Sequence, residues 1–198
     1  MNSASRRYPR HIQCGGSQIE IARMTSADRD TLVAFSTTLP QHDLLFLSRD
    51  VTEPKVIDAW MRALDSGEIS SLVARDGDVI LGHTAIFIDR LSWSRHVGEL
   101  RVLVSPAGRG RGLGRALVHE CFAQALEQGL TKLVAQMTTS QRAAIAVFEE
   151  MGFRAEALLA KHVADREGRL HDLVVLSYDV AAAAARNEIY GLSEAIDG

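Results

Sequence analysis

Glycine and arginine alternate in the segment Arg109-Gly110-Arg111-Gly112-Leu113-Gly114-Arg115, and a run with helical periodicity follows it directly. Glycine lets successive backbone N–H groups turn toward one point, and a helix start adds unpaired donors and the positive end of its dipole. Arginine side chains in the segment add positive charge. The segment therefore predicts a cradle for a phosphate or a similar anion. The alternative is a glycine-rich turn whose arginines are only solvated.

The spacing in this segment excludes two common phosphate motifs. A Walker loop requires Gly-Lys-Ser/Thr, and the segment contains no lysine. A dinucleotide fingerprint requires a third glycine three positions after the second, where this chain has Leu113 or Arg115. The chain instead contains Arg-x-x-Gly-x-Gly, formed by Arg109, Gly112 and Gly114, after a stretch that ends in Val-Ser-Pro.

The elements that must position this loop form a mixed α/β sheet, mostly antiparallel. Strands are expected from Ile19, at 70–75 and 79–89 around an Asp-Gly turn, and at 97–104. A buried strand at 132–137 and a closing hairpin at 153–163 and 169–178 follow, giving about seven strands. Apolar periodicity and helix-boundary residues predict about four flanking helices, at 25–38, 53–66, 113–127 and 141–151.

Length and composition indicate one domain of 198 residues, with 46% hydrophobic and 24% charged residues. We expect residues 1–18 to be a disordered N-terminal segment, residues 19–180 the folded domain, and residues 181–198 a helical or disordered tail. A net charge of −3 gives no reason to expect nucleic acid or a membrane as a partner. Two cysteines, no signal peptide and no membrane-length apolar run predict a cytoplasmic protein. No His/Cys cluster has metal-ligand spacing, so no metal is expected.

Two stretches resemble a known family. Gly98–Gly114, GELRVLVSPAGRGRGLG, resembles the central acetyl-CoA motif of the GNAT superfamily of N-acetyltransferases, and Ala144–Phe153, AIAVFEEMGF, is similar to the second motif of that family. The two lie about thirty residues apart, and the resemblance extends from Ile19 to Tyr178. It implies a GNAT-like fold and an enzyme that moves an acetyl group from acetyl-CoA to an amine acceptor. Because many relatives pair, it also implies a homodimer as a candidate assembly.

The resemblance assigns roles to residues of this chain. It implies that Arg109–Arg115 bind the pyrophosphate chiefly through the backbone, and that Leu103 and Val104 pair with the pantetheine arm like an added strand. Gln141 stands where the family commonly has an asparagine that contacts this arm. Phe148 stands where it usually has a tyrosine that can protonate the leaving thiolate, and phenylalanine has no proton to give. The expected cofactor-binding residues are Leu103, Val104, Arg109, Gly110, Arg111, Gly112, Leu113, Gly114, Arg115, Gln141 and Phe148.

Glu99 is the candidate general base. An alkylamine titrates near pH ~10, so a carboxylate must remove its proton or order a water that does. A carboxylate within a predicted strand calls for a reason, and several family branches have the proposed base at this place. The alternative is that Glu99 only pairs with Arg101 or Arg90 on a solvated face. Other branches have the base on the next strand, at a position occupied here by Gln136, which accepts no proton.

The sequence leaves the acceptor open between a small-molecule amine and a protein amine. His42 and Asp43 lie in the region that shapes the acceptor site in this family. The competing function is a non-catalytic acyl-CoA-binding regulatory module. Phe148 and Gln136 favour that alternative, whereas Glu99 favours the enzyme.

Overall fold

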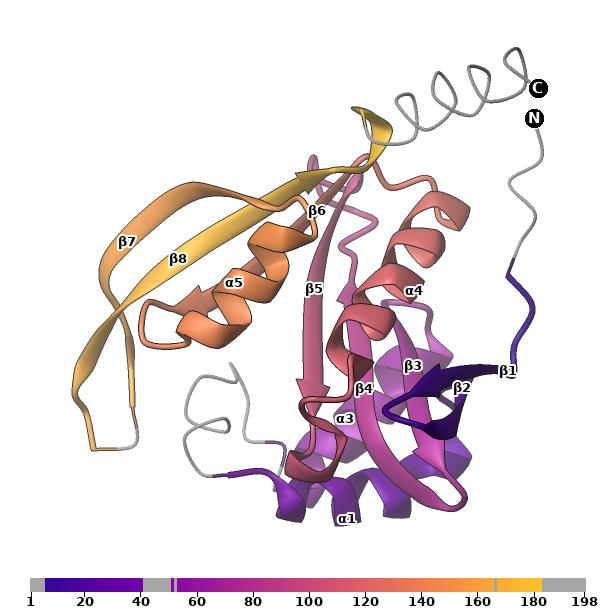
Figure 1. The fold of residues 1–198 in the computed structure, drawn as a ribbon. Helices are drawn as coiled ribbons and strands as arrows, with labels where there is room; N and C mark the ends of the chain where they lie inside the picture. Colours follow the sequence, from indigo (N-terminus) through magenta and orange to yellow (C-terminus); the bar gives the residue numbers. More distant parts are fainter. Residues whose placement is uncertain (1–5, 41–50, 52, 166, 183–198) are drawn as a thin grey trace, which may run out of the picture.

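The computed structural model describes residues 6–40, 51, 53–165 and 167–182. One mixed sheet carries helices on both faces (Figure 1), and short 3-10 turns at Ser26–Asp28 and Pro106–Gly108 precede α1 and α4. The helices and strands, in chain order, are β1 Arg10–Cys14, β2 Ser17–Arg23, α1 Arg29–Thr38, α3 Pro54–Asp65, β3 Ile69–Asp76, β4 Val79–Phe87, β5 Val97–Val104, α4 Leu113–Glu127, β6 Lys132–Thr138, α5 Arg142–Glu150, β7 Arg154–Ala164 and β8 Leu170–Asp179. Among the described residues, no helix is long and apolar enough to cross a membrane.

The sheet has its strands in the order β1-β2-β3-β4-β5-β6-β8-β7. Every neighbouring pair is antiparallel except β5 and β6, which are parallel. A parallel pair requires a crossover connection, and α4 provides it. The predicted mixed, mostly antiparallel sheet is confirmed. In the described part of the chain it has eight strands, one more than the sequence predicts.

The additional strand lies in the segment that the sequence predicts to be disordered. Residues 10–14 form β1 and residues 17–23 form β2, in register from Arg10↔Ile21 to Cys14↔Ser17. Gly15 and Gly16 make the turn with φ angles of 57° and 81°, a region that glycine enters without strain. Ile12 and Cys14, at alternate positions of β1, pack against the core. Because the residues around them are polar, this alternation is hard to recognise in the sequence. The expectation of disorder is therefore wrong for the described residues before position 19.

Glu120 of α4 fixes this hairpin to the body of the protein. Its side chain is buried and accepts hydrogen bonds from Tyr8 Oη at 2.8 Å and Arg10 Nη1 at 2.9 Å. Arg6 pairs with the same carboxylate at 2.7 Å. Burial and the hydrogen bond to Glu120 raise the pKa of Tyr8, so its phenol stays protonated and donates. A buried carboxylate needs such partners, and these three, within the described part of the chain, come from the N-terminal segment.

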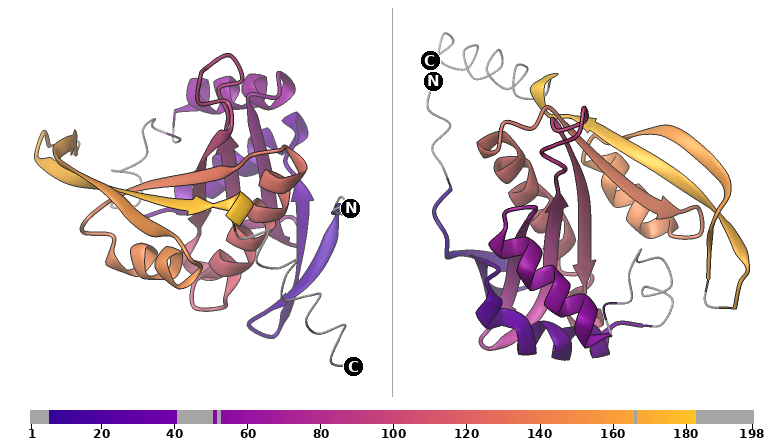
Figure 2. Two further views of the ribbon diagram at one scale, coloured as in Figure 1. Left: turned by 90° about the horizontal axis from the view of Figure 1, so that it is seen from above. Right: turned by 180° about the vertical axis from the view of Figure 1, so that it is seen from behind.

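Helices cover both faces of the sheet (Figure 2), and each face has its own hydrophobic core. Leu100 belongs to the core beneath α4 and α5, whereas Trp60 and Leu103 belong to the core beneath α1 and α3. Side chains alternate along a strand, so Glu99 and Arg101 share the face of Leu103. The candidate base therefore faces the α3 side of the sheet, whereas the helix that follows the glycine loop covers the other side.

The parallel contact between β5 and β6 is short. Three residue pairs, from Val97↔Lys132 to Glu99↔Val134, join the two strands, although both continue further. Gly98 lies in this contact and leaves no room for a side chain, because a Cβ there would lie 2.7 Å from Ile86 Cγ2 of β4 and 3.1 Å from Leu133 Cδ2 of β6. Beyond Glu99, the edge of β5 that faces β6 has no strand partner among the described residues. The sheet thus opens where the sequence predicts the reacting groups.

We expect Glu120→Ala to lower the free energy of unfolding by about 1–3 kcal/mol, because charge-assisted hydrogen bonds contribute this much and the freed arginines can still reach water. Tyr8→Phe removes one donor only and should cost about 1 kcal/mol. Urea unfolding of both variants measures the difference. Glu120→Ala with wild-type stability would show that the hairpin is not anchored in this way.

Candidate active site

The glycine loop connects the end of β5 to the start of α4. Gly110 and Gly112 have φ angles of 68° and 80°, and a Cβ on either would meet no atom within 4 Å. The first hydrogen bond of α4 runs from Ala116 N–H to the Gly112 carbonyl at 3.1 Å. The N–H groups of residues 113–115 therefore have no acceptor within the helix. The loop has the open space and the backbone donors that an anion site requires.

The three arginines of the loop lie at its rim and contact the protein. Arg109 Nε donates to the last carbonyl of β5 at 3.2 Å, and Arg111 Nη2 donates to the Cys14 carbonyl at 3.3 Å. Arg115 pairs with Glu150 of α5. The arginines are thus oriented by neighbours, while the glycines between them leave the backbone exposed. This arrangement agrees with a site that binds through backbone groups within a positive potential.

The predicted apolar residues of the site direct their side chains into the protein. Leu113 is fully buried in the core beneath the N-terminal hairpin, and Val104 packs partly buried against the same cluster. Leu103 packs on the opposite face with the α3 core. A ligand along the opening between β5 and β6 would therefore meet chiefly the backbone groups of Leu103 and Val104.

Glu99 is the last residue of β5 that pairs with β6. Arg101 donates from Nε at 3.0 Å and from Nη2 at 2.7 Å, and both bonds end on the same oxygen, Oε1. The side chain of Glu99 is 34% exposed. No described residue forms a hydrogen bond to its second oxygen, Oε2. The pairing with Arg101 that the sequence allows is present, and it occupies one of the two carboxylate oxygens.

Gln141 and Phe148 lie on the α5 side of the opening. The Gln141 side chain accepts a hydrogen bond from Thr138 N–H at 2.9 Å, so it caps the end of β6. Phe148 is buried and packs edge-on against Phe153, with ring centres 4.9 Å apart. Gln136 is exposed on β6. The structure thus gives both α5 residues structural contacts. His42 and Asp43 lie outside the described residues.

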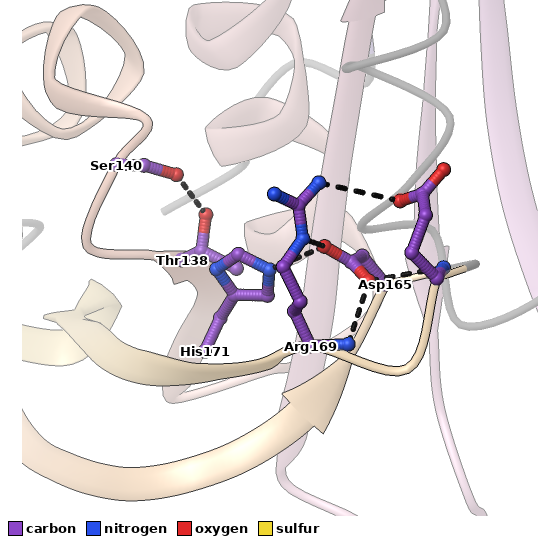
Figure 3. Close-up of polar contacts among 6 residues, drawn as sticks. Thr138, Ser140, Asp165, Arg169 and His171 are labelled. Atoms are coloured by element: carbon purple, nitrogen blue, oxygen red, sulfur yellow. Dashed lines mark hydrogen bonds and ion pairs between the residues drawn. The ribbon is translucent and has the colours of Figure 1, made fainter.

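A polar cluster at the β7–β8 turn was not predicted as part of the site (Figure 3). Asp165 is buried and accepts hydrogen bonds from His171 Nε2 at 2.9 Å and Arg169 Nε at 3.2 Å, and from the backbone of Glu167 and Arg169. These bonds, above all the one from His171, lower the pKa of Asp165 to about 2. Because β8 pairs along the whole of β6, the cluster fixes the hairpin tip near the carboxyl end of β6. The sequence predicts only a turn here, although these partners lie within six positions of Asp165.

Both cysteines are buried, and burial raises the pKa of the Cys121 thiol to about 12. Cys121 is therefore a protonated core residue at neutral pH and is a poor nucleophile. Within the described residues, no group of His, Cys, Asp and Glu side chains could hold a metal ion.

The sequence pattern of the acetyltransferase (GNAT) family matches residues 35–153, which include Glu99, the glycine loop and Phe148. The chain belongs to the acetyltransferase (GNAT) family. As the family and the named relatives below indicate, it is an acyltransferase.

Two curated relatives share 30% identity with the chain. One is the L-amino acid N-acyltransferase MnaT of Escherichia coli K12, aligned over 60% of this chain and 69% of that protein. The other is the L-methionine sulfoximine/L-methionine sulfone acetyltransferase of Salmonella typhimurium LT2, aligned over 64% and 74%. Among solved structures, yncA from Salmonella typhimurium, determined with its cofactor acetyl-CoA, has a TM-score of 0.70 and 24% identity. That match covers 83% of this chain and 95% of the other. It supports the fold.

The contact between the N-terminal hairpin and the glycine loop can be tested with two neighbouring glycines. A Cβ at Gly15 would lie 2.8 Å from Arg111 Cγ, whereas a Cβ at Gly16 would meet nothing within 4 Å. Alanine at either position is strained by roughly 1–2 kcal/mol because φ is positive. We therefore expect Gly15→Ala to lower the unfolding free energy more than Gly16→Ala does. Equal losses in urea unfolding would contradict the contact.

Proposed function

We propose that the protein transfers the acetyl group of acetyl-CoA to the primary amine of a small molecule, with Glu99 accepting the proton of the amine directly or through a water. The observation that carries this proposal is the geometry of Glu99. The carboxylate stands where β5 and β6 separate, and both hydrogen bonds from Arg101 fall on one of its oxygens. The names of the two curated relatives, which refer to amino acids and their derivatives, support a small acceptor.

The described residues fit acetyl-CoA, which supplies the acetyl group as an activated thioester. The glycine loop would hold the pyrophosphate, because the N–H groups of residues 113–115 have no acceptor within α4 and a Cβ at Gly110 or Gly112 would project into open space. The backbone of Leu103 and Val104 would hold the pantetheine arm along the free edge of β5. The solved structure of yncA with acetyl-CoA supports this assignment.

Glu99 would act on the acceptor and not on the cofactor. At neutral pH an alkylamine is protonated, and its nitrogen has no lone pair until a base removes the proton. Oε2 of Glu99, which the two Arg101 bonds leave unused, would accept that proton, while Arg101 keeps the carboxylate oriented through Oε1. Direct transfer is favoured over a cysteine intermediate, because Cys121 is a buried thiol whose pKa is raised to about 12.

With Phe148, the chain lacks the tyrosine hydroxyl that is usual at this position in the family. A phenylalanine at this position supplies no proton to a departing thiolate, and its ring is engaged in the core. A thiol has an ordinary pKa of about 8.5, so a thiolate can leave near neutral pH without an acid. The substitution is therefore compatible with catalysis.

The cofactor assignment predicts that acetyl-CoA raises the melting temperature, since a ligand that binds only the folded form stabilises it by mass action. Gly112→Asp should abolish this shift, because a carboxylate would occupy the anion's place. Gly129→Asp is the matched control: φ is 69°, nothing lies within 4 Å of its Cβ, and it follows the far end of α4. A shift retained in Gly112→Asp would remove the loop from the site.

The base assignment predicts that Glu99→Gln lowers turnover by about a hundred- to ten-thousand-fold at neutral pH with little change in acetyl-CoA affinity. The loss should shrink as the pH approaches the pKa of the amine, near ~10, because more acceptor then arrives neutral. Glu156→Gln, which breaks an ion pair with Lys132 elsewhere on the surface, should leave the rate unchanged. CoA release against an amine panel measures both variants.

Two results would count against this function. A Glu99→Gln variant with wild-type turnover across pH would leave Glu99 a structural partner of Arg101. A wild-type protein that binds acetyl-CoA and acetylates no amine would favour the non-catalytic acyl-CoA-binding module.

A further inference from the structure

A cavity lies beside Arg101 on the α3 side of the sheet. Its lining is largely apolar and comes from α3, β3, β4 and β5, with Trp60, Ala63 and Phe87 among the contributors. Two lining side chains carry strong polar groups, Arg101 and His83. The cavity therefore suits a ligand that is apolar along most of its length and has defined polar contacts.

The cavity and Glu99 lie along one row of side chains. The β4–β5 ladder brings three alternate pairs onto the same face, which are Phe87↔Glu99, Ala85↔Arg101 and His83↔Leu103. At a rise of about 3.3 Å per residue, Glu99 and Leu103 are separated by about 13 Å along β5, with Arg101 midway. A molecule whose amine lies at Glu99 would extend past Arg101 to reach the cavity.

Arg101 has binding capacity beyond its contact with Glu99. Its guanidinium lies 4.3 Å from the centre of the Phe87 ring and uses Nε and Nη2 for Glu99. A guanidinium carries five N–H donors in a rigid fork that matches a carboxylate. Because its side chain is 25% exposed at the edge of the cavity, an entering carboxylate can reach it.

His83 supplies a buried polar atom without a partner. Its side chain is 2% exposed and lies edge-on to Phe35 and Trp60, with ring centres 5.3 Å apart in both cases. Burial lowers the pKa of His83 to about 4, so the ring is neutral at neutral pH. Nδ1 has no hydrogen-bond partner among the described residues. A buried polar atom in this state calls for an explanation, and a ligand atom would provide one.

We propose that the acceptor is an α-amino acid whose amine lies at Glu99, whose carboxylate pairs with Arg101, and whose side chain enters this cavity and presents a polar atom to His83 Nδ1. The proposal rests on the acetyl transfer proposed above and names its acceptor class. His83 is then a specificity-determining residue, which favours side chains that are apolar along their length and polar near the end. Trp60, held by a hydrogen bond from its Nε1 to Ser71 Oγ at 3.3 Å, forms part of the wall.

Three acceptors of similar length separate the parts of this proposal: methionine sulfone, norleucine and pentylamine. The wild type should have a kcat/KM at least tenfold higher for norleucine than for pentylamine, because a charge-assisted bond to the carboxylate is lost in the amine. Methionine sulfone should exceed norleucine, because its sulfone oxygens can accept a hydrogen bond from His83. Equal kcat/KM values for norleucine and pentylamine would overturn the role of Arg101.

His83→Phe keeps an aromatic ring and removes both nitrogens. It should raise the KM for methionine sulfone about tenfold with little change in kcat, and leave the KM for norleucine unchanged or lower. A purely structural role would change both substrates equally, and that result would overturn the assignment of His83.

Ala63→Leu tests the cavity itself without altering a polar group. It should raise the KM for norleucine at least tenfold and leave alanine, whose side chain is short, nearly unaffected. Arg62→Leu introduces the same residue on the exposed side of α3 and should change neither substrate. Unchanged KM values in folded Ala63→Leu would mean that the side chain binds elsewhere. If none of the tested amines causes the wild type to release CoA, the acetyl transfer and this proposal fail together. If CoA is released but norleucine and methionine sulfone are not preferred over pentylamine, only the proposed acceptor class is overturned.

Discussion

The separation of β5 from β6 after Glu99 is the constraint on which the rest of the site depends. Each strand is committed to another neighbour, since β5 pairs with β4 up to Val104 and β6 pairs with β8 along its whole length. The two facing edges beyond Glu99 therefore remain without a strand partner. Because α4 is the crossover of a parallel pair, its N-terminus lies at the carboxyl end of β5, at the same opening. In open α/β sheets, ligands bind at the carboxyl ends of strands for this reason.

The candidate groups of the site lie on different faces of the sheet. The glycine loop and α4 stand on the face of Leu100, and Glu99 and Arg101 stand on the face of α3. The proposed anion site and the proposed proton acceptor are thus separated by one layer of backbone. The net charge of −3 does not indicate where an anion would bind, because the positive charge of the glycine loop is local. Local potential decides where an anion binds, and net charge does not.

The parts of the fold that rest on local patterns follow directly from the sequence. The predicted bounds of β5 and α4 agree with the structure, because proline and glycine interrupt the chain between a strand-forming run and a helical period. β1 was missed because its alternation is short and lies among polar residues, and its anchor, Glu120, is more than a hundred positions away. The cavity at His83 also depends on contacts between distant segments, which no local pattern reports. The Asp165 cluster is local to the β7–β8 turn, but a turn pattern does not show which of its side chains will bond to one another. The glycine loop, the proposed cofactor site, can therefore be predicted from the sequence, whereas the cavity, the proposed acceptor site, cannot.

The ion pair between Glu99 and Arg101 does not compete with the proposed role of Glu99 as a base. A lone carboxylate on a half-buried strand would be free to rotate away from the opening, and two bonds from Arg101 to a single oxygen hold it in one orientation. In the proposed function, the second oxygen would then accept the proton of an entering amine with little further loss of side-chain entropy. An acceptor that brings its own carboxylate would share the guanidinium with Glu99 and not displace it, because the arginine fork has more donors than Glu99 uses. The ion pair with Arg101 would therefore serve both roles of Glu99, because the same contact orients the carboxylate in the resting protein and in the complex with the acceptor.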